Sequence, residues 1–123
     1  MLKEEVIVNF WNSFGWKAYD ETAVPDDAEI PRITYSVVSD SLNHPVMMTA
    51  SLWDRSYSWE SVTRKSREIA QAIHEIYPPA IECEDGRVYI TAGDPFAQRM
   101  YDSNDDSIRR LYLNLEVEFF TEF

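Results

Sequence analysis

The chain has 123 residues, of which 45% are hydrophobic and 14% aromatic, so it is not a disordered protein and can build one core. Its 22 acidic and 11 basic residues give a formal net charge of -11, which excludes nucleic-acid binding through a general basic surface. We expect its two basic groups, 64–67 and 109–110, to be solvated faces among acids. The length predicts a single domain over residues 1–123.

Residues 2–14 have an apolar stripe at helical spacing, and Gly15 follows as a stop, so this segment predicts an amphipathic helix. Residues 16–31 contain two prolines and several acids, and they read as a polar connector. The acids lack the spacing and the glycine of a calcium-binding loop, so we expect an ordinary loop.

Two strands are predicted next, at Arg32–Ser39 and Val46–Trp53, joined by turn residues as an antiparallel hairpin. Ser58 is a candidate N-cap for a helix that ends near Tyr77, before two prolines. One face of this helix is apolar and the other is charged, which indicates packing on a sheet.

The last third of the chain predicts three strands. Asp85-Gly86 is a hairpin signal between 81–84 and 87–92, and residues 93–106 read as a long polar loop. Residues 108–123 alternate between apolar and polar, as expected for a strand with one buried face. The predicted fold is therefore α+β with two layers: a mostly antiparallel sheet with two helices packed on it, in the order α-β-β-α-β-β-β.

The chain offers few residues for catalysis. Its two histidines, His44 and His74, are isolated, and the single Cys83 has no neighbour that would lower its pKa, so we expect structural roles for all three. Three scattered glycines do not make a phosphate-binding loop, and one Cys with two His does not make a zinc site. We therefore expect no enzyme activity, no metal and no cofactor.

The N-terminal sequence lacks the apolar stretch of a signal peptide, and no segment is long and apolar enough to span a membrane. We therefore expect the protein to be made in a cytoplasm and kept or assembled there, without a membrane partner.

The aromatic residues are too many for a core of this size. We expect some of them to be exposed as a protein–protein contact surface, although the first helix could instead cover part of the second sheet face. The surplus aromatics are Trp53, Tyr57, Trp59, Tyr89, Tyr112, Phe120 and Phe123.

Several of these segments together resemble a known family. A Pro-x-Ile-x-Tyr entry into the first strand (31–35), an aromatic–polar–Ser-x-Ser turn (53–58), a helix ending in Ala72-Ile73 and a closing alternating strand (111–123) follow an N-terminal helix. This pattern spans nearly the whole chain and resembles the tail-terminator and tail-completion proteins of long-tailed bacteriophages and prophages.

The resemblance implies a structural virion protein that forms a hexameric ring. Such a ring caps the tail tube, stops its growth and presents a surface to the head connector, so the implied partners are other copies, the tail-tube protein and the connector. DNA would only pass through, and the strong acidity fits a conduit that repels phosphate. The implied location is the tail or neck of the virion, assembled in the bacterial cytoplasm.

By position, the 94–106 loop and the 20–29 connector are candidates for ring or tube contacts. Some of their acids could face the channel: Asp26, Asp27, Glu29, Asp102, Asp105 and Asp106. The candidate interaction residues are Trp53, Tyr57, Trp59, Asp26, Asp27, Glu29, Phe96, Tyr101, Asp105 and Asp106. Other neck roles (head completion or minor capsid protein) and a cytoplasmic protein-binding module remain alternatives, and a small enzyme is the least favoured one.

Overall fold

A computed structural model describes residues 2–36, 45–75, 81–84, 86–101 and 105–121. Residues 40–44 of the turn predicted at 40–45, the predicted helix end at Tyr77, and Asp102 and Phe123 lie outside these ranges, and Pro45 begins a strand. The elements in chain order are α1 (Lys3–Trp11), a 3-10 turn η1 (Asn12–Phe14), β1 (Lys17–Asp20), β2 (Arg32–Tyr35), β3 (Pro45–Arg55), α2 (Glu60–Glu75), β4 (Ile81–Cys83), β5 (Gly86–Met100) and β6 (Ile108–Thr121).

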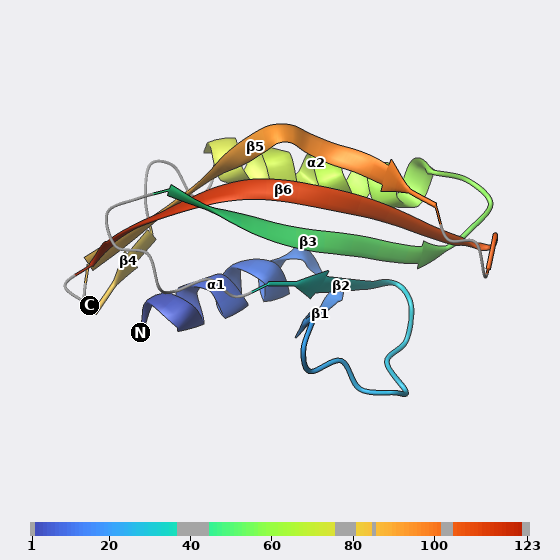
Figure 1. Cartoon of the computed structure of the whole chain (residues 1–123), viewed down its shortest axis with the longest axis horizontal. Helices are drawn as coiled ribbons and strands as arrows, with labels where there is room; N and C mark the ends of the chain where they lie inside the picture. Colours follow the sequence, from blue (N-terminus) through green and yellow to red (C-terminus); the bar gives the residue numbers. More distant parts are fainter. Residues whose placement is uncertain (1, 37–44, 76–80, 85, 102–104, 122–123) are drawn as a thin grey trace.

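The six strands form one sheet in the order β1-β2-β3-β6-β5-β4 (Figure 1). All neighbouring strands are antiparallel except β1 and β2, which are parallel. The sheet is long and curved, and its central strands β3 and β6 pair continuously from Pro45↔Glu118 to Arg55↔Ile108 (Figure 1). The predicted α+β class and the mostly antiparallel sheet are confirmed.

Both helices pack on the same face of the sheet, as the alternating pattern of β6 requires. On β6, the odd-numbered residues from Leu111 to Phe119 are buried, and the side chains between them are partly or fully exposed. α1 adds Phe10 and Trp11, whose rings meet edge to face at 4.9 Å, and α2 adds Val62 and Ile69 to the same cluster. The two-layer prediction is therefore correct.

The connector predicted at 16–31 is only partly a loop. Its first residues, Lys17–Asp20, form β1, which pairs in parallel with β2 at the sheet edge. A four-residue strand with charged ends lacks a strong alternating pattern, so the tertiary pairing rather than local propensity forms it. The observed order is thus α-β-β-β-α-β-β-β, one strand more than predicted.

The predicted 93–106 loop was wrong over its first half. β5 continues to Met100 and pairs with β6 on both sides of a register shift between Ala92 and Ala97. Pro95 lies inside this bulge, where a missing backbone N–H costs no regular ladder bond. The Asn114 side chain donates a hydrogen bond to the Pro95 carbonyl at 3.1 Å and closes the bulge.

Candidate functional site

Five of the predicted interaction residues come together at one end of the sheet. At this end β3 leads into α2, and β5 returns to β6 (Figure 1). Trp59, Tyr101 and Asp106 line one small hollow there, of about 250 Å³. Tyr57 and Asp105 lie at the same end, because Arg109 donates a hydrogen bond to the Tyr57 carbonyl and Arg55 pairs with Asp105. We call this region the turn end.

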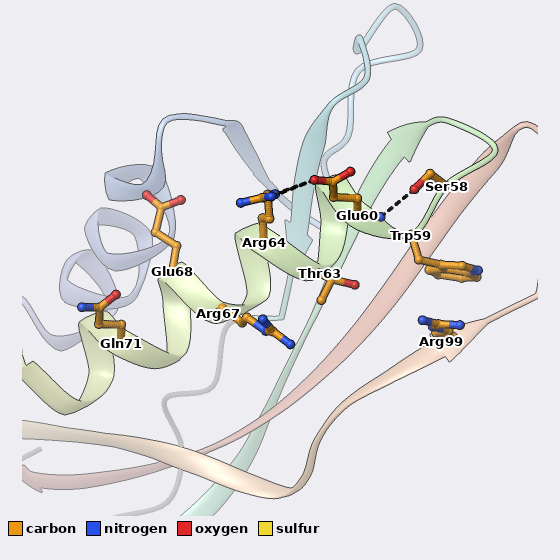
Figure 2. A pocket seen from close by; sticks show the side chains of 9 residues that line it. All are labelled: Ser58, Trp59, Glu60, Thr63, Arg64, Arg67, Glu68, Gln71 and Arg99. Atoms are coloured by element: carbon orange, nitrogen blue, oxygen red, sulfur yellow. Dashed lines mark hydrogen bonds and ion pairs between the residues drawn. The ribbon is translucent and has the colours of Figure 1, made fainter.

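Two arginines lie against the ring of Trp59 at the turn end. The guanidinium carbons of Arg99 and Arg109 lie 4.9 and 5.4 Å from the centre of its ring, within the range of a cation–π contact. Figure 2 shows the Arg99 side chain beneath the indole ring. Trp59 is half-buried, whereas Tyr57 and Tyr101 are 77% and 89% exposed. The two tyrosines are therefore the aromatic groups that a partner could reach here.

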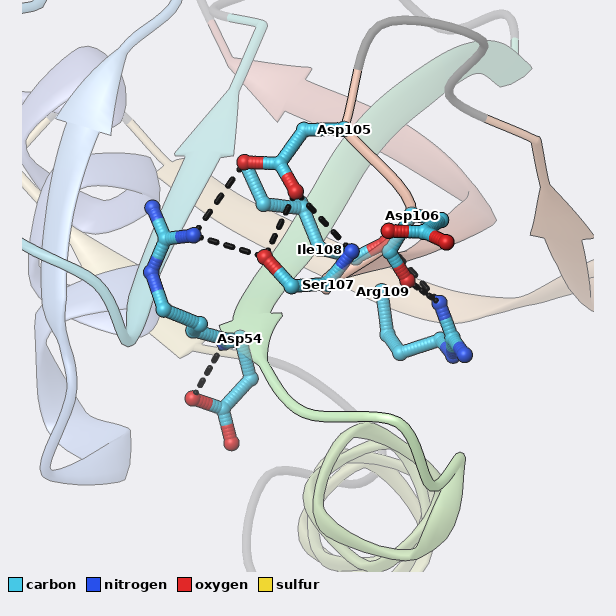
Figure 3. Close-up of polar contacts among 7 residues, drawn as sticks. Asp54, Asp105, Asp106, Ser107, Ile108 and Arg109 are labelled. Atoms are coloured by element: carbon cyan, nitrogen blue, oxygen red, sulfur yellow. Dashed lines mark hydrogen bonds and ion pairs between the residues drawn. The ribbon is translucent and has the colours of Figure 1, made fainter.

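Asp105 links the residues just before β6 to the end of β3. Its carboxylate accepts hydrogen bonds from the backbone N–H and the hydroxyl of Ser107 (Figure 3). The carboxylate also forms an ion pair with the Arg55 guanidinium at 3.1 Å. The hydrogen bonds from Ser107, and then that from Arg55, lower the pKa of Asp105 below its ordinary value. Because the carboxylate is already bonded within the chain, its most direct role is to fix the shape of the turn end.

Trp53 lies on the outer face of the sheet, opposite the helices. Arg110 and Arg32 flank its ring at 4.7 and 5.6 Å, and its Nε1–H donates a hydrogen bond to the Thr34 hydroxyl at 2.9 Å. The Arg110 Nε donates in turn to Ser51 Oγ at 3.0 Å. Trp53 is therefore half-buried in a network that crosses β2, β3 and β6.

The remaining predicted residues lie apart from the turn end cluster. Phe96 is half-buried in the β5 bulge and packs against the core. Asp26, Asp27 and Glu29 are exposed on the connector between β1 and β2. The structure therefore brings together five of the ten candidate residues and places the connector acids at the sheet edge formed by β1.

A shallow groove of about 690 Å³ runs between α2 and β5 (Figure 2). Arg64 in this groove pairs with Glu60 at 2.8 Å, and Glu68 pairs with Lys65 at 2.8 Å. Its other basic residues are Arg67 on α2 and Arg99 on β5, and within the described part of the chain neither has a carboxylate partner. The groove residues are Ser58, Trp59, Glu60, Thr63, Arg64, Arg67, Glu68, Gln71 and Arg99.

The arginines are the part of the site that the sequence did not reveal. Arg109 and Arg110 were expected to be solvated, but both are half-buried and stack on tryptophans from opposite sheet faces. The available signal was that the two arginines are consecutive residues of a predicted strand. Neighbouring strand residues point to opposite faces of a sheet, so such a pair can contact tryptophans on both faces.

Among the described residues, no group of His, Cys, Asp and Glu is arranged to hold a metal ion. No described helix combines the length and apolar character needed to cross a bilayer.

No protein-family model matches the chain, and no curated protein matches it. Its fold is similar to that of a chain in a solved structure, "Virion of native gene transfer agent (GTA) particle". The TM-score is 0.58, with 12% sequence identity, and the match covers 94% of this chain and 84% of that chain. At this identity the likeness shows a shared fold along almost the whole domain.

Proposed function

We propose that this chain is a structural subunit of a phage-like virion. The observation that carries the proposal is the fold shared with a chain of a gene transfer agent virion over 94% of the present chain. Within that class, the family resemblance of 31–35, 53–58 and 111–123 favours a tail terminator: a hexameric ring that caps the tail tube and joins it to the head connector.

The charge supports a role beside passing DNA. A net charge of -11 on a subunit repeated around a channel repels phosphate and lets DNA slide without binding. Asp106 is exposed at the turn end and is our candidate for a channel-facing acid, whereas Asp105 is held by Arg55 and Ser107. The proposed subunit needs no cofactor and no catalytic activity.

The exposed aromatics at the turn end support contacts with other virion proteins. Tyr57 and Tyr101 expose most of their surface beside a fixed polar turn, and exposed aromatic groups of this kind are enriched in protein–protein interfaces. We propose the tail-tube protein or the head connector as the partner of this end.

Deletion of the gene from its phage or prophage tests the proposal by electron microscopy of the particles. A tail terminator predicts overlong tails that the intact gene, supplied in trans, returns to uniform length. Normal tails beside unjoined heads would instead assign a head-completion role. Normal infectious particles would refute a virion role and favour a cytoplasmic binding module.

A further inference from the structure

Unpaired carboxylates gather at one edge of the sheet. The connector at 21–31 joins the edge strand β1 to β2 and carries four exposed acids, which make no ion pair within the described residues: Glu21, Asp26, Asp27 and Glu29. The connector has a defined shape, because Ala28 N–H donates to the Pro25 carbonyl at 3.1 Å and Arg32 donates to the Ala28 carbonyl at 3.0 Å. Its acids are therefore presented on a folded segment.

Unpaired guanidinium groups lie at the other edge. Among the described strands, β4 borders β5 at Gly86–Val88, and beyond these residues β5 pairs with β6 alone. Arg99 on this exposed part of β5 and Arg67 on α2 both line the α2–β5 groove, and both are exposed. The stacking of Arg99 against Trp59 fixes its position without neutralising its charge.

We propose that the acidic connector of one copy binds the α2–β5 groove of the next copy, head to tail. The two surfaces are complementary in charge and belong to opposite sheet edges of the same chain. An interface between two different patches of identical subunits closes into a ring when the rotation between them closes. The proposal deepens the ring function above and rests on it, and it assigns the connector acids to the subunit contact rather than to the channel.

Other occupants fit the groove less well. Nucleic acid would have to approach a protein of net charge -11, and the described residues of the groove offer it two arginines without a carboxylate partner. A guanidinium instead binds carboxylates with two parallel hydrogen bonds, and the connector supplies several carboxylates on one short segment. Exposed charge pairs are screened over about 8 Å at physiological ionic strength, so the contact weakens as salt is added.

Charge exchange tests the contact on the full chain. One variant carries Arg67→Glu and Arg99→Glu, and the other carries Asp26→Arg and Asp27→Arg. Each variant alone then presents like charges on both surfaces, and we expect its self-association, measured by analytical ultracentrifugation at low salt, to be at least tenfold weaker than that of the wild type. A mixture of the two restores opposite charges at every contact and is expected to assemble with both chains present.

Matched controls separate this contact from a general charge effect. Arg87→Glu changes the charge as Arg67→Glu does, but at the β4 end of the sheet, and Glu116→Arg is the control for Asp27→Arg on the exposed outer face. Both controls should associate like the wild type, and thermal unfolding should show every variant folded.

Three results would overturn the contact. The first is that the mixture associates no more strongly than each variant alone. The second is that the wild type does not associate even at about 1 mM protein in low salt. The third is that the wild type binds a short DNA duplex and that Arg67→Glu with Arg99→Glu abolishes this binding. The deletion strain can also be complemented with the Asp26→Arg and Asp27→Arg variant. Tails of normal length with slow DNA delivery would then assign these acids to the channel. If deletion leaves tail length unchanged while the mixture assembles, the terminator function fails and the contact stands.

Discussion

The bulge in β5 leaves no room for a side chain at Gly93. A Cβ added there would lie 2.8 Å from the carbonyl oxygen of Asn114 and 3.0 Å from its carbonyl carbon. Both are backbone atoms of the central strand β6, so they cannot rotate away as a flexible side chain would. We predict that Gly93→Ala pushes the bulge away from β6.

Extra atoms forced into a packed position cost about 1–3 kcal/mol of folding free energy. Because the clash involves backbone rather than a side-chain tip, we expect about 2 kcal/mol, which lowers the Tm of a domain this size by about 6–10 °C. Urea denaturation followed by circular dichroism measures this loss, with the slope m unchanged if only the native state is affected.

Gly15 provides a control with a different cause of strain. It has a φ of 85° and no heavy atom within 4 Å of an added Cβ, so only its left-handed backbone opposes a side chain. Gly15→Ala should therefore cost about 1 kcal/mol and Gly15→Asn less, since asparagine tolerates this conformation. Asn114→Ala should not rescue Gly93→Ala, because the two nearest clashing atoms belong to the backbone. A Gly93→Ala protein within about 0.5 kcal/mol of the wild type would refute the reasoning.

Three further predictions concern the core and the turn end. Leu115→Ala removes a fully buried side chain from the centre of β6 and should cost about 2–5 kcal/mol in denaturant unfolding; a smaller loss would contradict its core position. Asp105→Asn should destabilise the protein at neutral pH, and its difference from the wild type should shrink as pH falls through the lowered pKa of Asp105. Protonation then removes the charge that strengthens the hydrogen bonds from Ser107 and the ion pair with Arg55, as the substitution does; a pH-independent difference between the two melting curves would contradict this. Tyr57→Ala should leave Tm unchanged, because the side chain is 77% exposed and only its carbonyl is bonded, but should reduce complementation of the deletion strain; a fully active variant would exclude Tyr57 from the partner surface.

The elements with a strong period could be predicted from the sequence. The alternation of β6 and the apolar stripe of α2 each involve many residues, so tertiary contacts reinforce the local pattern. β1 was missed because its four residues carry no strong alternating pattern, and the second half of β5 was missed because of the residues at its bulge. Gly93 and Pro95 are turn residues in isolation, and only the bulge opposite Asn114 makes them compatible with a strand.

The candidate site was predictable in its aromatics and not in its arginines. A surplus of aromatic residues is visible in composition, and Tyr57 from that set is exposed, as is Tyr101 from the predicted loop; their role in a contact stays a prediction. The environment of Trp53 and Trp59 was not predictable, because each ring is covered by arginines from strands far away in sequence. From the pattern of charges alone, such arginines are predicted to be exposed to solvent.

The tandem Arg109-Arg110 has a consequence for strand registration. An alternating strand such as β6 keeps the same buried face if it slips by two residues along β3, so alternation alone does not fix the absolute alignment. Arg110 lies opposite Trp53 in the observed register, and Arg109 reaches Trp59 on the other face. A slip of two residues would separate both arginines from their tryptophans at once. The two cation–π contacts, one on each face of the sheet, therefore favour the observed register of β6 against β3.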